Sequence, residues 1–556
     1  MDVAASALII QEARTERSKR DALALNVPTE TLIMSRAALV GWHDVGKAAR
    51  GFQAKVPVLF PSAFGGLRPG ETGIGFNHGL ATAFILGQRC SDLMQLVTPK
   101  LLPQEHDALA LTIGGHHGKP LEEPIDHYGR FAFDKLIGAP AIATAREAAL
   151  DVWRRLGEPV LPLEDEDGGD VVTRFCWGLA GLTTFADWVG SDSEFFPIGE
   201  PPESAEDYWP KALERARRAV RAKGLTPAKV AVSGGMEALF GIFSPRPAQQ
   251  VAETVALPEG PMLSIIEDVT GAGKTEAAME LAHRMMAAGK GEGIYFALPT
   301  MATANAMFER LHAAHGRLFA PGERPSLALL HGRRDLSDRF AEVRLAGRMP
   351  QTSEEDAIAA ACAAWIADDR RRAFFAEVGA GTIDQALLAI LPKKFFALRQ
   401  EGLAGRILVV DEAHGYDAYV GEELARLLEF HAAAGGSAIV LSATLTRRQR
   451  KTLTDAWASG LGAPPAAPEQ TAYPLMTVAS RARVEERPVP AAEISRRQVA
   501  VARIADWDRA LEQVAEAAKA GAAVAVLRNA VDDVIATQAA LAARGCDATL
   551  FHARFA

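Results

Sequence analysis

The sequence predicts a multidomain protein in which an all-α domain is followed by an α/β domain with a parallel sheet. Up to about residue 240, apolar residues recur every three or four positions, as on amphipathic helices. From about residue 260, short apolar segments such as MLSIIED (262–268) and RILVVDE (406–412) alternate with helical segments, which is typical of a parallel sheet covered by helices. The 556 residues also exceed what one hydrophobic core usually holds, so several domains are expected.

Changes of pattern divide the chain into three expected parts. Prolines gather at 197–210 and 243–250, as they do at domain edges. Another strand–helix pattern begins near residue 500 with AVAVLRNA (523–530), and the sequence stops before completing it. The expected parts are a helical domain over 1–235, an α/β domain over 236–480 and the start of a second α/β domain over 481–556.

Composition and charge exclude several classes of protein. Hydrophobic residues make up 49% of the chain and charged residues 23%, which excludes disordered and fibrous proteins. No apolar run reaches the ~18 residues of a membrane span, and no secretory signal is recognised, so we expect a cytoplasmic protein without a membrane partner. The net charge of −9 argues against coating nucleic acid by bulk electrostatics, although a local groove can still hold a strand. The cysteines are too far apart for a CxxC zinc site and are expected to be buried free thiols: Cys90, Cys176, Cys362 and Cys546.

A glycine-rich turn between an expected strand and an expected helix carries a phosphate-binding pattern, DVTGAGKT (268–275). Its glycines let backbone N–H groups approach phosphate oxygens, and the helix N-terminus adds favourable partial charge. Lys274 is expected to reach the β- and γ-phosphates and Thr275 to bind Mg²⁺. Asp268 stands where the strict pattern has glycine, which leaves an incidental glycine turn as the alternative. The expected nucleotide-binding residues of this turn are Thr270, Gly271, Gly273, Lys274 and Thr275.

Two more strand ends carry polar residues of the same chemistry. ILVVDEAH (407–414) ends in Asp411, which can hold Mg²⁺, and Glu412, which can polarise the attacking water. SAIVLSAT (437–444) ends a further strand. In isolation the Asp-Glu pair fits a helix cap and a solvated acid equally well. Because all three segments end parallel strands in this order, they predict one NTP-hydrolysing site.

The histidines gather in the N-terminal part, where six of the thirteen lie before residue 130. Imidazole nitrogens and carboxylates bind transition metals, and a carboxylate such as Asp44 can bridge two ions. Two metals about 3.5–4 Å apart can clamp the attacking and leaving oxygens of a phosphodiester. A purely structural His–Asp arrangement is the alternative. WHDVGK (42–47) is expected on a helix continuing into ARGFQ, while His106 and His127 fit no motif and are expected to be solvent-exposed. The candidate metal-binding group is His43, Asp44, His78, His116, His117 and Asp187.

Together these motifs resemble an HD phosphohydrolase-like domain followed by a superfamily 2 DEAH-box helicase with RecA-like domains. That combination is similar to the CRISPR-associated helicase–nuclease of type I systems, and the resemblance covers almost the whole chain. The stretches that carry it are HDVGKAARGFQ, IGGHHG, ADWVGSD, VTGAGKTEAA, GAGTIDQALLAILPKKFFALR (379–399), VVDEAHGYDAYV and LSATLTRRQR.

The resemblance implies a metal-dependent single-stranded DNA endonuclease and exonuclease coupled to an ATP-dependent DNA helicase that degrades foreign DNA. It implies two divalent transition metal ions in the HD domain (Fe, Mn, Co or Ni), and ATP with Mg²⁺ in the helicase domain. The implied partners are the crRNA-guided Cascade complex and the displaced DNA strand of its R-loop. The candidate metal-binding group becomes the implied ligand set, with Asp44, Lys47 and Glu412 as the implied catalytic residues. Gln249 is the implied adenine reader, and 297–311, otherwise a plain amphipathic helix, the implied nucleic-acid contact.

The sequence departs from the family's pattern at both ends. The family's first metal-binding histidine precedes a segment like Asp2–Ala5, which here almost begins the chain. The family also continues beyond a stretch like TLFHARFA (549–556). We therefore expect a truncated chain that binds ATP weakly and does not unwind DNA. Two alternatives stay open: an HD-type nucleotide phosphohydrolase with a regulatory NTPase unit, and an inactive pseudo-enzyme that binds Cascade.

Overall fold

The computed structural model of the protein describes most of the chain and groups it into two units. Residues Met1–Ala492 form one unit and Glu493–Ala556 a second. The expected division of the first unit near residue 235 is not tested by this grouping and stays a prediction. The described residues are 1–67, 73–118, 121, 135–164, 170–197, 204–330, 373–465, 467–492 and 499–551.

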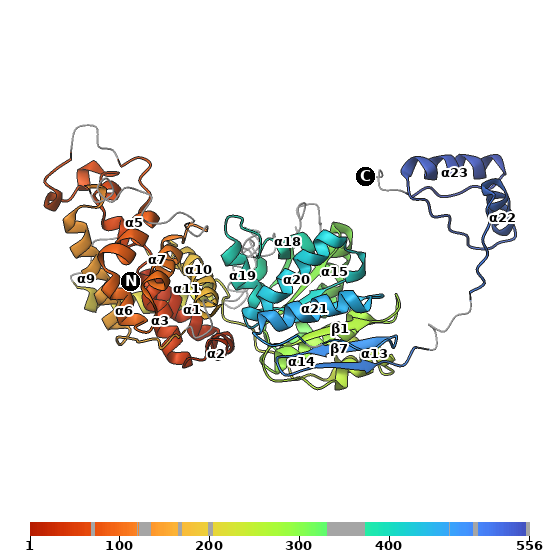
Figure 1. Ribbon diagram of the computed structural model, residues 1–556, viewed down its shortest axis with the longest axis horizontal. Helices are drawn as coiled ribbons and strands as arrows, with labels where there is room; N and C mark the ends of the chain where they lie inside the picture. The colour runs from red at the N-terminus through yellow and green to blue at the C-terminus, as the bar shows by residue number, and fades with distance from the viewer. Residues whose placement is uncertain are drawn as a thin grey trace. The chain divides into compact units, whose positions relative to one another are not determined.

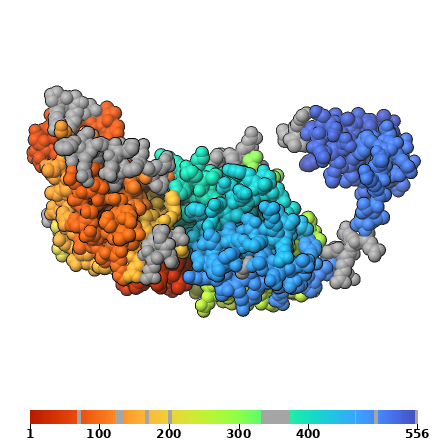
Figure 2. Space-filling view, in the orientation of Figure 1, coloured from red at the N-terminus to blue at the C-terminus, as the bar shows by residue number. Residues whose placement is uncertain are grey.

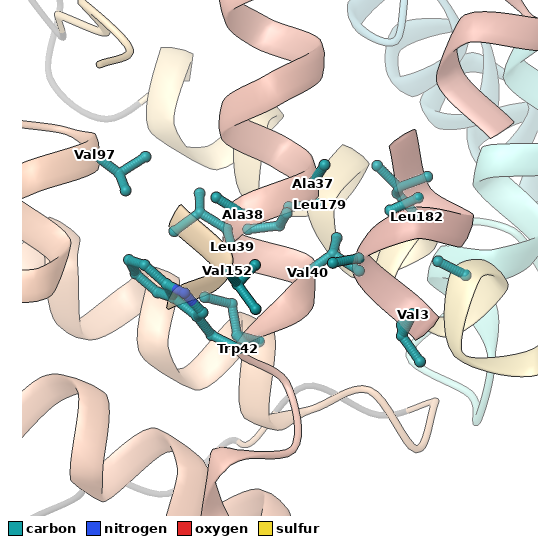
Figure 3. Packing of buried hydrophobic residues seen from close by; sticks show 14 of the residues in the cluster. Val3, Ala37, Ala38, Leu39, Val40, Trp42, Val97, Val152, Leu179 and Leu182 are labelled. Carbon is teal, nitrogen blue, oxygen red and sulfur yellow. The ribbon is translucent and has the colours of Figure 1, made fainter. Parts of the chain in front are cut away.

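The regular elements among the described residues of the N-terminal part are all helices, as expected (Figure 1, red to yellow). Helix α1 is apolar almost all the way round, so it is buried at the centre, against α3, α10 and α11. Figure 3 shows Trp42 within this core, and its indole Nε1 donates a hydrogen bond to the carbonyl oxygen of Ala149 over 2.9 Å. The main helices are α1 (Asp2–Ala13), α2 (Thr15–Ala24), α3 (Thr29–Gly41), α5 (His78–Phe84), α6 (Ser91–Val97), α7 (Pro103–Gly114), α9 (Ala139–Arg155), α10 (Asp170–Gly190) and α11 (Ala205–Ala222).

An eight-stranded sheet follows, in the order β3-β4-β2-β5-β6-β1-β7-β8. The first six strands are parallel and confirm the expected architecture, whereas β7 and β8 add an antiparallel edge. The charged sequence VEERP of β8 suits a sheet edge, where it discourages pairing with another chain. The strands are β1 (Leu263–Glu267), β2 (Ile294–Leu298), β3 (Leu327–Leu330), β4 (Val378–Thr382), β5 (Ile407–Val410), β6 (Ser437–Ser442), β7 (Leu475–Ala479) and β8 (Val484–Pro488).

Helices cover both faces of this sheet, which explains why its central strands are apolar without alternation. Ile266 faces a core shared with α14 and α15, and its neighbour Ile265 faces a second core shared with α20 and α21. The helices of this part are α12 (Gly235–Phe240), α13 (Pro247–Thr254), α14 (Lys274–Ala287), α15 (Met301–Ala314), α18 (Ile383–Leu387), α19 (Phe396–Ala404), α20 (Ala418–Ala433) and α21 (Arg447–Gly460).

The helical part and the sheet part meet in one interface within the first unit (Figure 2). Helix α10 packs against α19. Arg14, between α1 and α2, crosses the interface with its Nε 2.9 Å from Glu292 Oε2 and its Nη1 3.2 Å from Glu401 Oε1. Because these charged groups are buried, removing one partner would leave the other uncompensated.

The second unit contains α22 (Trp507–Lys519) and α23 (Val531–Ala543), which pack through Leu511, Ala515 and Leu541. Residues 523–530 precede α23 but are assigned to no strand among the described residues, so the expected strand is not formed. A strand needs a neighbour for its backbone hydrogen bonds, and none is described beside this segment. No helix among the described residues is both long and apolar enough to cross a membrane.

Two further expectations concern isolated side chains. His106 was expected to be exposed, but it is 3% exposed and its Nε2 lies 3.0 Å from the carbonyl oxygen of Thr98. The prediction was wrong because this polar ring finds a backbone partner inside the core. Cys90 is buried and free, whereas Cys176 and Cys546 are free but only half-buried. His127 and Cys362 lie outside the described residues.

Candidate functional site

The His43–Asp44 segment is a tight turn, not the continuous helix expected from the sequence. Helix α3 ends at Gly41, and a short 3-10 helix spans Val45–Ala48 before α4 (Arg50–Gln53). The Thr82 hydroxyl of α5 donates to the His43 carbonyl oxygen over 2.8 Å and accepts from the Gly46 N–H over 3.0 Å. A Cβ atom at Gly46 would overlap the backbone of α5, so glycine permits this approach. Contacts with α5 therefore hold the turn.

Three other histidines reach this turn from two helix ends. His78 is the first residue of α5, whose N-terminus is capped by the Asn77 side chain. His116 and His117 follow the last residue of α7, Gly114. The Nε2 atoms of His117 and His78 lie 3.0 Å apart, and the ring centroids of His43 and His116 lie 4.8 Å apart. The turn and these helix ends thus place four imidazoles side by side.

Backbone carbonyls orient two of these rings. His43 Nδ1 lies 2.9 Å from the carbonyl oxygen of Val40, and His116 Nδ1 lies 3.1 Å from that of Ile113. A carbonyl oxygen accepts only an N–H, so each Nδ1 carries the proton when the ring is neutral, and each Nε2 keeps its lone pair. This is the arrangement by which metal-binding histidines are usually held.

Two carboxylates complete the group. Asp44 lies between the rings, with Oδ2 3.1 Å from His43 Nε2 and Oδ1 3.3 Å from His78 Nε2 and 3.6 Å from His116 Nε2. Asp187, near the end of α10, lies with Oδ1 3.5 Å from His43 Nε2. Ser191 donates a 2.9 Å hydrogen bond to the same Asp187 oxygen. All six residues of the candidate metal-binding group are therefore brought together.

The charges at this site favour a cation. Burial opposes the charged form of His43, but the nearby carboxylates of Asp187 and Asp44 raise its pKa to about 9. Burial raises the pKa of Asp44, yet its contacts with His43 and His78 outweigh this and hold that pKa far below the usual range. Burial, with the nearby charge of His43, lowers the pKa of His116 to about 3. The two carboxylates therefore stabilise one positive charge, on His43, whereas protonation of His116 is unfavourable.

The residues fit divalent transition metal ions. Among the described residues, His78, His116 and His117 form one group of potential ligands, and His43, Asp44 and His116 form another. Within each group the ligand atoms lie within 4.8 Å of one another. The buried Nε2 of His43 and Oδ1 of Asp44 make no well-directed hydrogen bond within the described residues. Nitrogen and carboxylate donors suit Mn, Fe, Co and Ni, and the shared His116 places the two groups side by side.

Lys47, the remaining expected residue of this site, lies at its rim. Its ammonium is 2.5 Å from Asp44 Oδ2, and its side chain is 44% exposed. A flexible cation beside the carboxylate can reach an anionic substrate from solvent without leaving the site.

The phosphate-binding pattern forms the turn that the sequence predicts, between β1 and α14. Gly271 and Gly273 have φ values of +80° and +87°, a backbone conformation that glycine adopts without strain. Lys274 Nζ donates to the carbonyl oxygens of Asp268 at 2.7 Å and Val269 at 3.0 Å. The Asp268 carboxylate accepts from the Val269 N–H at 2.8 Å, so an aspartate in place of glycine is compatible with the turn.

A cavity of about 730 Å³ opens beside this turn. Every residue expected to bind nucleotide lines it: Gln249, Thr270, Gly271, Gly273, Lys274, Thr275, Asp411 and Glu412. The Gln249 side chain lies within the wall, where its Oε1 accepts from the Arg246 N–H at 2.9 Å. Its role as an adenine reader stays a prediction. The volume suits a small-molecule ligand of nucleotide size.

Two arginines line the same cavity without having been predicted. Arg246 belongs to the proline-rich segment just before Gln249, and that neighbourhood is the one signal that could have indicated it. Arg310 comes from α15 and pairs with Glu276 of α14. Its segment, 297–311, was expected to contact nucleic acid, and nothing in the sequence indicates a position beside the phosphate loop. Both guanidiniums can contact a nucleotide's phosphates.

The ends of β5 and β6 are connected directly. His414 Nδ1 lies 3.2 Å from the Ala443 N–H, which donates to it, and 3.3 Å from Glu412 Oε2. Tyr416 donates its hydroxyl proton to the Asp411 carbonyl oxygen at 3.0 Å. Burial, with the neighbouring charge of Glu412, raises the pKa of Asp411. A cation beside Asp411 would relieve that unfavourable charge, as expected for a carboxylate that holds Mg²⁺.

Comparison with known proteins connects both sites to one family. Residues 1–196 match the family model "Cas3, HD domain". The chain is 36% identical over 470 residues to the CRISPR-associated endonuclease/helicase Cas3 of Thermus thermophilus, covering 82% of this chain and 49% of that protein. It is 33% identical over 395 residues to its counterpart in Escherichia coli, covering 68% and 43%. The chain therefore spans about half the length of these curated relatives.

The fold has solved counterparts as well. The crystal structure of T. fusca Cas3-ADP matches with a TM-score of 0.82 and 26% identity, covering 100% of this chain and 63% of that one. The similarity thus extends over the helical part, the sheet part and the second unit together.

Proposed function

Because this chain belongs to the Cas3 family over the length that it spans, we propose that it combines a metal-dependent nuclease with an ATP-binding helicase unit. The nuclease acts on single-stranded DNA in the helical part, and ATP with Mg²⁺ binds in the cavity beside Lys274. The whole protein degrades foreign DNA that a crRNA-guided Cascade complex has opened, in the cytoplasm.

The single observation that supports the nuclease best is the position of Asp44. Its two oxygens lie between the imidazole nitrogens of His43, His78 and His116. In this proposal His43, Asp44, His78, His116, His117 and Asp187 would hold two divalent transition metal ions. Bound there, such ions supply an activated water and stabilise the charge of a phosphodiester in hydrolysis. Lys47 contacts the scissile phosphate from the rim.

The same reasoning assigns the residues of the second site. Lys274 and the N-terminus of α14 bind the nucleotide's phosphates, Thr275 and Asp411 hold Mg²⁺, and Glu412 orients the attacking water. Gln249 contacts the adenine.

The test is nicking of circular single-stranded DNA by the full chain with Mn²⁺, Co²⁺ or Ni²⁺. The Asp44→Ala variant is expected to lose nicking, since it removes the carboxylate between the ligand groups. Lys274→Ala is the matched control: it removes a buried charge from the other site and is expected to nick as the parent does.

Other outcomes distinguish the alternatives. Hydrolysis of free nucleotides with no cleavage of single-stranded DNA would favour the nucleotide phosphohydrolase. Failure to retain any transition metal after dialysis, together with no cleavage, would favour the pseudo-enzyme. Equal nicking by the parent and Asp44→Ala would refute the assignment of this site.

A further inference from the structure

One residue of the sheet part, Phe395, contacts the residues that directly follow two candidate metal ligands, His117 and Asp187. Phe395, immediately before α19, donates its backbone N–H to the carbonyl oxygen of Gly118. Its ring meets the Trp188 ring edge-on, with centroids 5.5 Å apart. Gly118 follows His117 directly, and Trp188 follows Asp187 directly. A single side chain from outside the helical part thus lies against the neighbours of two candidate ligands.

The backbone on both sides of this contact is unusual. Phe395 has a φ of +66°, a left-handed conformation that is unfavourable for a non-glycine residue. Gly118 has a φ of +97°, and a Cβ atom there would overlap the Phe395 ring. Strain of this kind persists only where surrounding contacts enforce it, and it is concentrated at functional sites.

Hydrogen bonds connect the contact to the ligands themselves. On α10, the Thr184 hydroxyl donates to the His116 carbonyl oxygen at 3.0 Å, joining α10 to the His116–His117 loop. Asp187 lies one turn further along the same helix. The position of α10 relative to that loop therefore sets the distance between Asp187 and the histidines, and Phe395 contacts both.

The neighbouring residue provides a comparison. Phe396 packs edge-on against Trp177 of α10, with ring centroids 4.9 Å apart, and is buried. It makes the same kind of aromatic contact across the same interface. Trp177 lies ten positions before Asp187 and is joined to no candidate ligand by a hydrogen bond among the described residues. Packing of the interface and positioning of the metal centre can therefore be separated.

We propose that Phe395 is a positioning residue for the metal centre: the sheet part holds the His117 and Asp187 segments at the spacing that metal binding requires. The inference rests on the proposed function only in assuming that transition metals bind at this centre. The metal affinity of the helical part then depends on Phe395, a residue of the sheet part on the other side of the interface.

The experiment is a Co²⁺ titration of the full chain, followed by the visible absorption of the bound ion, with melting temperature measured in parallel. Phe395→Ala is expected to weaken Co²⁺ binding about 10- to 100-fold, as loss of groups that orient ligands does, and to change the absorption band. Phe395→Tyr keeps the ring and is expected to restore both. Phe396→Ala is the matched control, expected to lower the melting temperature while leaving Co²⁺ affinity unchanged.

Either of two results would overturn the inference: unchanged Co²⁺ affinity in Phe395→Ala, or equal weakening in Phe395→Ala and Phe396→Ala. If Phe395→Ala does not fold, Phe395→Leu retains apolar volume without the ring face, and the same comparison with Phe396→Ala applies. A parent chain that binds Co²⁺ but does not nick DNA would refute the proposed nuclease and leave this inference standing. A parent chain that binds no Co²⁺ would refute both.

Discussion

Arg450 and Glu267 form a buried ion pair directly behind the phosphate loop. Arg450 Nε lies 2.8 Å from Glu267 Oε2, and the two side chains are 5% and 2% exposed. Glu267 ends β1, and its other oxygen accepts from the Leu445 N–H at 3.0 Å, just beyond β6. Arg450 also reaches Glu486 of β8 at 2.9 Å. The pair therefore joins β1, the strand that precedes the loop, to the segment after β6 on one side and to β8, beyond β7, on the other.

Removing one member of this pair should cost far more than removing both. Glu267→Ala leaves the Arg450 guanidinium buried with only part of its compensating charge, and we expect the free energy of unfolding to fall by about 3–5 kcal/mol. The double variant Glu267→Leu with Arg450→Leu leaves neither charge of the pair, and Glu486 keeps the backbone N–H donors of Glu469 and Gln470, so this variant should lose less. Urea denaturation of the parent, the single variant and the double variant measures both losses of stability. Equal losses in the single and double variants would contradict the prediction.

The hydroxyl of Thr82 should matter to metal binding as well as to stability. Thr82→Val keeps the shape of the side chain but leaves the His43 carbonyl oxygen and the Gly46 N–H without their partner. We expect a loss of about 1–3 kcal/mol in the free energy of unfolding, and weaker Mn²⁺ binding because the His43–Asp44 turn loosens. Calorimetry with Mn²⁺ and urea denaturation are the measurements.

A second buried threonine supplies the control for Thr82. Thr183 is fully buried, and its hydroxyl donates to the carbonyl oxygen of Leu179, within its own helix, at 2.6 Å. Thr183→Val should lower stability without weakening Mn²⁺ binding. Equal Mn²⁺ affinity in the Thr82 and Thr183 variants would show that the turn does not depend on this hydroxyl.

Adding and removing the metal should shift the stability of the chain. An ion that binds only the folded state at 100 times its dissociation constant stabilises that state by about 2.7 kcal/mol. We expect Mn²⁺ to raise the melting temperature, EDTA to reverse the rise, and Asp44→Ala to abolish it. Calorimetric melting curves with and without EDTA measure the effect. A similar rise in Asp44→Ala would place the stabilising ion elsewhere.

His431 should make the fold sensitive to mild acid. Its Nε2 donates to the Ser437 carbonyl oxygen at 3.0 Å, and burial, aided by the charges of Arg17 and Arg20, lowers its pKa to about 4. Between pH 6.5 and 4 the unfolded chain binds a proton that the folded chain refuses. Folding stability is therefore lost as pH falls through this window, by up to about 1.4 kcal/mol per pH unit.

The His431→Gln variant isolates this contribution. Glutamine can still donate a hydrogen bond but does not titrate, so the variant should lose less stability than the parent between pH 7 and pH 5. Urea denaturation at both pH values gives the difference. An identical pH dependence of folding stability in the two proteins would show that protonation of His431 does not destabilise the fold in mild acid.

Much of the fold and both candidate sites could be predicted from the sequence, for a local reason. The residues of the nucleotide cavity follow strands, and the carboxyl ends of parallel strands meet at one edge, so order along the chain indicates neighbourhood in space. The helix expected through His43 failed because local periodicity does not register the hydrogen bonds of Thr82, which lies 39 positions away from it. His106 failed likewise, since its partner is a backbone carbonyl oxygen within the core.

By itself, then, the sequence determined which chemistry the chain carries: the histidines and aspartates of one centre, the phosphate loop and acids of the other, and the order of helical and α/β parts. Only the tertiary structure decided how these groups are used. It selected which imidazole nitrogen faces Asp44, brought Arg246 and Arg310 to the cavity, and placed Phe395 against Gly118 and Trp188. These relationships join segments distant along the chain, and packing and hydrogen bonding between such segments leave no periodic trace in the sequence.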